Sequence, residues 1–174
     1  MVEIPIGFRF YKDQIKKAAE VAGLEPAVVA AVCWQESSFC ADGYRFEPDF
    51  WNRYLKQNPK YRHLNPRRVS ASYGLMQVMY PLVHEDRLVE NDAVEPEALF
   101  SPTLNLATGC GWLRKLVDWA AERTPDQELV LVAALASYNG GRGGNDPSKD
   151  SPLRNARYAR EVLAKVKVLR VHYK

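Results

Sequence analysis

The chain has 174 residues, of which 47% are hydrophobic and 26% are charged, and its formal net charge is +3. These values are typical of one soluble globular domain spanning residues 1–174. They exclude a membrane span, because no apolar run approaches the roughly 20 residues that one requires. Residues 1–13 lack a basic-then-apolar signal pattern, so we expect a chain that is made in the cytoplasm or is already mature.

The basic residues are concentrated at the end of the chain. From Arg142 onward there are nine Lys or Arg and three Asp or Glu. This imbalance suits an anionic polymer such as nucleic acid, a membrane surface or bacterial wall. It equally suits the solvated face of a final helix.

The cysteines and histidines give no pattern typical of a metal site. No CxxC pair occurs, and the three histidines are scattered along the chain. We therefore expect neither a metal nor a cofactor. One disulfide is possible, but a fold of this size does not require it, and we expect three reduced, buried thiols. The cysteines are Cys33, Cys40 and Cys110.

The first two predicted helices are separated by a glycine. Helical spacing over 11–22 stops at Gly23, and Pro26 begins a second helix that runs to Ser37. This arrangement resembles a DNA-binding helix-turn-helix, but the second helix presents Ala, Val and Cys where base readout needs polar side chains. We interpret it as a core helix.

Glu36 lies at the end of that apolar helix, next to Trp34 and close to Phe39. Low-dielectric surroundings disfavour the ionised carboxylate and raise its pKa. A carboxyl group that stays protonated near neutral pH can serve as the general acid of glycosidic cleavage. The alternative is a solvated helix end or one half of an ion pair.

Residues 41–70 differ in character from the rest, because aromatic residues alternate with arginines and prolines interrupt the pattern. We predict a short helix from Pro48 to Gln57. The aromatics can stack on sugars or bases, or they can pack a small core of their own. We favour a mixture in which some of them face a cleft.

The remaining elements are predicted to be mostly helical. A glycine turn at Gly74 leads into a short helix or strand that ends at Pro81, followed by a short helix over 82–88 and a polar stretch to about 94. A single helical turn is predicted over 95–100, followed by a long helix over 103–123 in which Gly109 and Gly111 permit close contact with a neighbouring element. A buried helix begins at Pro125 and ends at a glycine-rich segment over 137–145. The last predicted helix is basic and covers 156–171. No segment alternates convincingly as a strand does, so the fold class is mainly α.

Three motifs now occur in one order along the chain: Gln-Glu-Ser-Ser-Phe at 35–39, Gly-Leu-Met-Gln-Val at 74–78, and Ala-Leu-Ala-Ser-Tyr-Asn-Gly-Gly at 134–141. In this order the chain resembles lytic transglycosylases with the soluble-transglycosylase (SLT) lysozyme-like domain, and also goose-type lysozymes. Residues 105–109 resemble a further motif region of the family, and residues 24–30 and 158–162 extend the likeness to goose-type lysozymes. It covers most of the chain except 41–70, which we interpret as an insertion.

The resemblance implies a helical lysozyme-like domain with a substrate cleft, acting on the glycan strands of peptidoglycan as a monomer. Glu36 matches the catalytic acid of the family. The resemblance also implies a wall for the cleft that binds N-acetyl sugars. The substrate-binding residues expected from it are Ser37, Ser72, Gly74, Leu75, Met76, Gln77, Tyr138 and Asn139.

The implied reaction is cleavage of the MurNAc-GlcNAc β-1,4 bond with formation of 1,6-anhydro-MurNAc. Goose-type lysozymes have an acidic residue directly after Gly-Leu-Met-Gln-Val, and here that residue is Met79, which disfavours hydrolysis. The alternative is a muramidase that uses Glu47 or Asp49 as its second carboxylate. A wall-binding module without activity and a nucleic-acid binder explain the ordered motifs less well. Expected places of action are the periplasm, or the wall reached by a phage or secretion apparatus.

Overall fold

The computed structural model describes residues 3–84, 87–90 and 95–174. Within these ranges helices dominate, and the mainly α fold class predicted from the sequence is confirmed. The α-helices are α1 (Phe8–Val21), α2 (Pro26–Ser37), α3 (Pro48–Phe50), α4 (Pro66–Val69), α5 (Pro102–Ala121), α6 (Gln127–Gly140) and α7 (Ala156–Leu169). Short turns of other helix types are η1 (Trp51–Leu55), η2 (Pro96–Phe100), η3 (Arg142–Gly144) and η4 (Arg170–His172).

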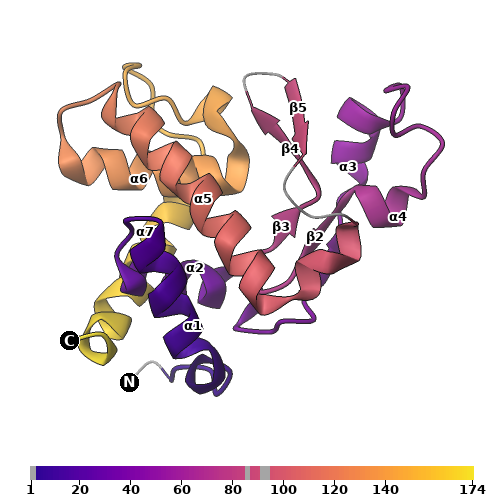
Figure 1. The fold of residues 1–174 in the computed structure, drawn as a ribbon. Coiled ribbons are helices and arrows are strands. Elements are labelled where there is room, and N and C mark those ends of the chain that lie inside the picture. Colours follow the sequence, from indigo (N-terminus) through magenta and orange to yellow (C-terminus); the bar gives the residue numbers. More distant parts are fainter. Residues whose placement is uncertain (1–2, 85–86, 91–94) are drawn as a thin grey trace.

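Helices α1, α2, α6 and α7 form one half of the molecule, here called the helix lobe (Figure 1). Every residue of α2 from Ala27 to Trp34 is buried, because a helix that is apolar all round gains most at the centre of a core. Helices α1 and α7 are amphipathic, and each covers α2 with a single apolar stripe. The end of α2 that carries Glu36 is therefore held by a rigid core.

The second half, here called the sheet lobe, contains all of the described strands. Strands β1 (Tyr44–Phe46), β2 (Ala71–Tyr73) and β3 (Val78–Met79) form an antiparallel sheet in that order. Strands β4 (Pro81–His84) and β5 (Arg87–Glu90) form a separate antiparallel ribbon. Figure 1 shows this ribbon standing between the helix lobe and the segment that carries α3 and α4.

The short helix predicted over 82–88 is wrong. Leu82 pairs with Val89, and Val83 pairs with Leu88, so two brief apolar runs face each other across a ladder. Runs this short have no helical period to maintain, and ladder pairing satisfies their backbone groups instead. Residues 85–86 lie outside the described residues. So do residues 91–94, which end the expected polar stretch.

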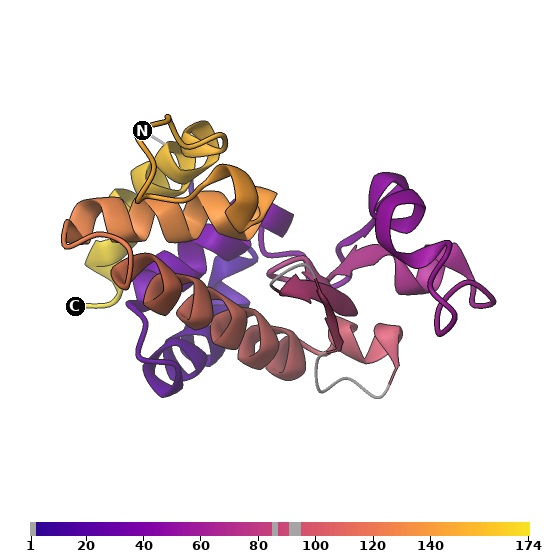
Figure 2. The same cartoon turned by 90° about the horizontal axis from the view of Figure 1, so that it is seen from above.

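The aromatic-rich insertion packs around a small core of its own, formed by Leu55, Tyr61 and Val69. Its first residues also provide β1, so the insertion is anchored in the central sheet. Arg68, near the end of the insertion, forms a bidentate pair with Glu97 of η2. Seen from above in Figure 2, the insertion lies well away from the helix lobe.

Helix α5 runs from the helix lobe toward the sheet lobe (Figure 2). A Cβ atom at Gly109 would lie 2.5 Å from Met76 Sδ, so only glycine permits the observed contact between this helix and the loop after β2. The same role predicted for Gly111 is wrong, because a Cβ there would meet nothing within 4 Å.

Other expectations need smaller corrections. Helix α1 begins earlier than predicted, at Phe8, and α6 continues through Asn139 to Gly140 before Gly141 ends it with a positive φ of 74°. Cys33 and Cys110 are buried free thiols as expected, but Cys40 is exposed, because it follows the end of α2 at the surface. Among the helices of the described residues, none combines the length and apolar character needed to cross a membrane.

Candidate active site

Glu36 occupies the last turn of α2, and the backbone directly after it has an unusual conformation. Ser38 and Phe39 both have positive φ, at 52° and 62°, which is uncommon outside glycine. Such residues cost free energy and persist only where the surroundings fix them. Here the buried ring of Phe39 packs against Phe8, so the chain turns sharply and leaves Glu36 at the rim of the core.

The carboxyl group of Glu36 is partly buried and accepts a hydrogen bond from the hydroxyl of Tyr158 on α7, with 2.5 Å between the two oxygens. Burial raises the pKa of Glu36 above its ordinary value of 4.5, and the charge of Glu47 adds to this rise. The Tyr158 hydrogen bond and the charge of Arg45 lower the pKa without cancelling the effect of burial. The raised pKa favours the protonated form of Glu36, which is the form that can donate a proton.

The loop between β2 and β3 is held in place by hydrogen bonds to Asn105, whose side chain on α5 is fully buried. Its Nδ2 donates to the carbonyl oxygens of Tyr73 (2.7 Å) and Leu99 (2.8 Å), while its Oδ1 accepts from the Met76 N–H (2.8 Å). Gly74 turns the loop with a φ of 69°, and a Cβ there would lie 2.5 Å from Asn105 Nδ2. This loop is thus fixed by the core.

A cavity of about 260 Å³, here called the inner cavity, opens beside Glu36. It takes residues from α2, the sheet, the insertion, α5 and α6. Its lining consists of Glu36, Arg45, Glu47, Phe50, Ser72, Gln77, Val78, Met79, Gly109, Trp112, Tyr138 and Asn139. The two carboxyl groups in this lining belong to Glu36 in the helix lobe and Glu47 in the sheet lobe.

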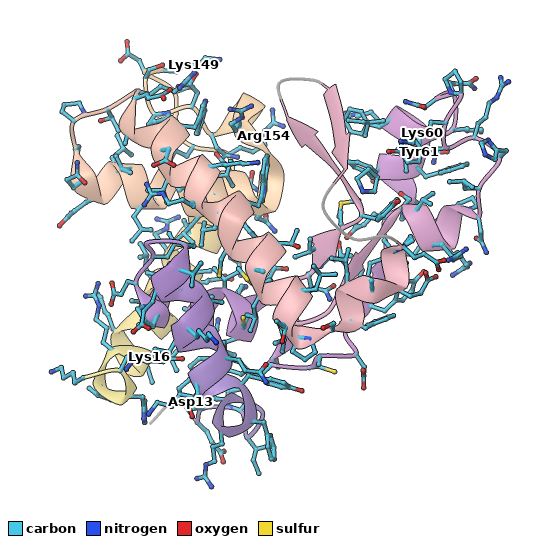
Figure 3. All side chains as sticks on the ribbon, in the orientation of Figure 1. Asp13, Lys16, Lys60, Tyr61, Lys149 and Arg154 are labelled. Carbon is cyan, nitrogen blue, oxygen red and sulfur yellow. The ribbon has the colours of Figure 1, made fainter. Side chains whose placement is uncertain are left out.

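A larger cavity of about 1060 Å³, here called the outer cavity, continues from the inner one. The two share Phe50, Met79, Trp112, Tyr138 and Asn139, so they form one cleft between the helix lobe and the insertion. The lining of the outer cavity includes Tyr54 from the insertion and the glycine-rich segment after α6. Arg154 also lines it, and Figure 3 shows this residue on the helix lobe facing the β4–β5 ribbon.

The profile of the family described as "Transglycosylase SLT domain" matches residues 13–161, which is most of the chain. The chain belongs to this family. Its SLT domain thus carries the lysozyme-like fold expected from the three ordered motifs, and the matched range includes α2, the sheet and the first part of α7 up to Glu161.

Two individual proteins are similar to this SLT domain. Membrane-bound lytic murein transglycosylase C from Edwardsiella ictaluri (strain 93-146) is 27% identical in an alignment of 138 residues, which covers 76% of this chain and 32% of that protein. The X-ray structure of an inactive mutant of the lytic transglycosylase Slt from Pseudomonas aeruginosa superposes with a TM-score of 0.59 at 18% identity, covering 98% of this chain and 25% of that one. The chain therefore spans between a quarter and a third of the length of these relatives.

The residues predicted to bind substrate fall into two groups in this SLT domain. Ser72, Gln77, Tyr138 and Asn139 line the inner cavity together with Glu36. The others support the site instead of lining it: Leu75 and Met76 have fully buried side chains, and the Ser37 hydroxyl donates to the Leu75 carbonyl at 2.8 Å. Gly74 is buried as well. Substrate contact by any of these residues stays a prediction.

Two tyrosines near Glu36 have different partners. The hydroxyl of Tyr138 donates to the Met76 carbonyl at 2.8 Å. Tyr158, which the sequence placed on the apolar face of the last helix, donates to Glu36. No signal in that apolar stripe separates a tyrosine that bonds to a carboxyl group from one that only packs.

The aromatic side chains of the insertion divide as expected. Phe50 lines the inner cavity, and Tyr54 lines the outer one, while Tyr61 is buried in the insertion's own core. Of the two carboxylates considered for hydrolysis, Glu47 lies in the inner cavity and Asp49 lines only the outer one. Across 3–84, 87–90 and 95–174, no three His, Cys, Asp or Glu side chains gather where they could hold a metal ion.

Proposed function

We propose that this SLT domain is a peptidoglycan lytic transglycosylase, which cleaves the MurNAc-GlcNAc β-1,4 bond and forms a 1,6-anhydro-MurNAc end. The observation that carries the proposal is Glu36, a carboxyl group with a raised pKa at the wall of a cleft between two lobes. The family and the names of both relatives agree with this activity. Its substrate is the glycan strand of the bacterial wall.

The proposed reaction has two steps, and Glu36 acts in both. First, the proton of Glu36 passes to the glycosidic oxygen, the C1–O bond breaks, and the acetamido oxygen of the muramyl residue bonds to C1. Second, the 6-hydroxyl oxygen of the same sugar attacks C1, the acetamido C1–O bond breaks, and the hydroxyl proton returns to the Glu36 carboxylate. All atoms come from the substrate and one side chain, and the enzyme is regenerated.

The other members of the site have supporting roles in this proposal. Tyr158 orients the Glu36 carboxyl group through its hydroxyl. Gln77 and Asn139 offer amide groups to the N-acetyl and hydroxyl groups of the sugars, and Trp112 and Phe50 offer aromatic surface on which sugar rings stack. The outer cavity has room for further sugar units of the strand.

Met79 favours the transglycosylase over the muramidase. It lines both cavities and has no group that can deprotonate a water molecule. The 6-hydroxyl is tethered to the reacting sugar, so its effective concentration at C1 is high and it competes well against water.

Mass spectrometry of digested, purified sacculi tests the proposal. The expected products carry 1,6-anhydromuramyl ends, which lack one water (about 18 Da) compared with the reducing ends of a hydrolase. Glu36→Gln should lose about 10²- to 10⁴-fold in rate while it remains folded. Predominantly reducing muramyl ends from the wild type would instead identify a muramidase, and a Glu36→Gln rate above about a tenth of wild type would remove Glu36 as the acid.

A further inference from the structure

Glu47 is fixed at the edge of the inner cavity by three backbone contacts. It directly follows β1, where its N–H donates to the Ser70 carbonyl at 2.8 Å, and its own carbonyl accepts from the Ser70 hydroxyl at 2.7 Å. The same carbonyl accepts the Trp51 N–H at 3.2 Å. The insertion and the central sheet together therefore determine where the Glu47 side chain begins.

The carboxylate itself is also held, but only through one oxygen. Oε1 accepts hydrogen bonds from Arg45 Nε (2.6 Å) and from the Ser72 hydroxyl (3.0 Å). Oε2 receives no hydrogen bond from the part of the chain that the structure describes. The side chain is 28% exposed and lines the inner cavity. Oε2, whose position is set by the bonds to Oε1, can therefore accept a hydrogen bond from a bound molecule.

A purely structural ion pair is a weak explanation for this arrangement. The Arg45 side chain is 57% exposed, and pairs this open to solvent contribute little to stability. The Ser72 side chain is almost fully buried and lines the same cavity, yet its hydroxyl is also directed at Glu47. Two polar groups thus orient a single carboxylate toward the space beside Glu36.

The two carboxyl groups of the inner cavity therefore differ in chemistry. Burial favours the protonated form of Glu36, a donor, whereas Glu47 is paired with a guanidinium and is an acceptor. Cleavage assisted by the substrate's acetamido group needs both kinds of group. The acid protonates the leaving oxygen, and an acceptor holds the acetamido N–H so that its oxygen points at C1.

We propose that Glu47 Oε2 accepts a hydrogen bond from the acetamido N–H of the sugar whose C1–O bond is cleaved, and that Arg45 and Ser72 are positioning residues that act through Glu47. The proposal deepens the proposed function and rests on it. Glu47 takes up no proton in this role. As the acetamido oxygen bonds to C1, positive charge develops on the nitrogen, and a fixed anion beside it stabilises the transition state.

The test compares Glu47→Gln with a matched control, Asp42→Asn, which removes one negative charge from the exposed loop just before β1. Glu47→Gln should lower kcat on sacculi about a hundredfold, the scale expected when one preorganised polar group is removed from a site. KM should change little, because the contact strengthens only as charge develops. Asp42→Asn should keep the wild-type kcat.

A second readout distinguishes substrate contact from a structural role. N-acetylglucosamine-thiazoline is a bicyclic analogue of the cyclised acetamido intermediate, and its protonated ring nitrogen carries the N–H that Glu47 would bind. Calorimetry at mildly acidic pH, where this nitrogen is protonated, measures its binding without turnover. Its Kd should rise at least tenfold in Glu47→Gln and stay unchanged in Asp42→Asn. Arg45→Gln keeps the Glu47 carboxylate but removes the Arg45 hydrogen bond that orients it. This variant should give an intermediate loss of both kcat and thiazoline affinity. It serves as the second variant if Glu47→Gln folds poorly.

Wild-type kcat in Glu47→Gln would overturn the inference, and so would a slow variant that binds the thiazoline as tightly as the wild type. Failure of the proposed function has a different result, which is reducing muramyl ends from the wild-type enzyme. A weakened thiazoline complex would still support the Glu47 contact in that case, because the acetamido step precedes the choice between water and the 6-hydroxyl.

Discussion

The hydroxyl of Tyr158 donates a hydrogen bond to Oε1 of Glu36, and the two residues are separated by 122 positions in the sequence. The bond joins the last helix of the chain to the end of its central helix. Because the carboxylate form of Glu36 accepts this bond more strongly, Tyr158 opposes the effect of burial on the pKa of Glu36. The strength of this opposition can be measured.

Tyr158→Phe should move the alkaline limb of the pH–rate profile to higher pH. Glu36 must be protonated to act, so the rate falls as the pH rises through its pKa, and removing a hydrogen bond that lowers this pKa raises it further. The maximal rate should also fall, because the carboxyl group loses its orientation.

Tyr138→Phe is the matched control for that experiment, since its hydroxyl bonds to the Met76 carbonyl and not to Glu36. This variant should leave the alkaline limb where it is, whatever its effect on the rate. Equal displacement of the limb in both variants would contradict the assignment of Tyr158 as the partner of Glu36.

Glu36→Gln should make the protein more stable than the wild type at neutral pH. The folded-state pKa of Glu36 lies above the ordinary value of 4.5, so the folded protein binds this proton more tightly than the unfolded chain does. Stability is then lost as the pH rises between the two pKa values, by about 1.4 kcal/mol for each pKa unit of difference. Glutamine carries no charge and avoids this loss.

Melting temperatures of both proteins between pH 4 and pH 8 check the prediction. The advantage of Glu36→Gln should be full above the raised pKa and should disappear as the pH falls to the ordinary value. An advantage that is independent of pH, or one that grows toward acid, would mean that Glu36 is not destabilised by its burial.

Asn105→Ala should lower the free energy of unfolding by about 3 kcal/mol or more. The substitution leaves a buried N–H and two buried carbonyls without their partner, and each such group costs about 1–3 kcal/mol. Urea unfolding measures the change. Asn52→Ala, an exposed position, should change stability by about 0.5 kcal/mol or less, and a similar value for Asn105→Ala would show that its hydrogen bonds are replaced by water.

Gly109→Ala and Gly111→Ala should have opposite effects on stability, although the two residues are only two positions apart on α5. The first inserts a methyl group against Met76 in a packed core, where overpacking costs about 1–3 kcal/mol. The second gains the helix propensity of alanine over glycine, up to about 1 kcal/mol, without meeting any atom. Thermal unfolding of the pair checks this, and a stable Gly109→Ala variant would show that the loop below α5 can move aside.

The helices could be predicted because their signals are local. Glycine and proline mark the ends of α1 and α2, and the apolar run in α2 correctly indicated a helix at the centre of the core. That run also predicted the effect of burial on Glu36, since the surroundings of a residue at the end of a buried helix follow from the helix itself.

The strands and the second half of the site could not be predicted in this way. Strands of two to four residues are too short to display alternation, and β1 pairs with β2 across an insertion of more than 20 residues. Glu47 enters the inner cavity only because of that pairing. Tyr158 was equally hidden, since a tyrosine on an apolar helix face gives the same pattern with or without a polar partner.

Cys40 is an exposed thiol to which a chemical probe can be attached. Burial raises the pKa of the Cys33 thiol well above its usual range and that of Cys110 to about 12, so neither forms the reactive thiolate readily. Cys40 is the one exposed thiol of the three, and it follows Glu36 by four residues. A maleimide dye should therefore label the unmodified chain at a single position, and because Cys40 lines neither cavity, the dye leaves the lining of the cleft unmodified.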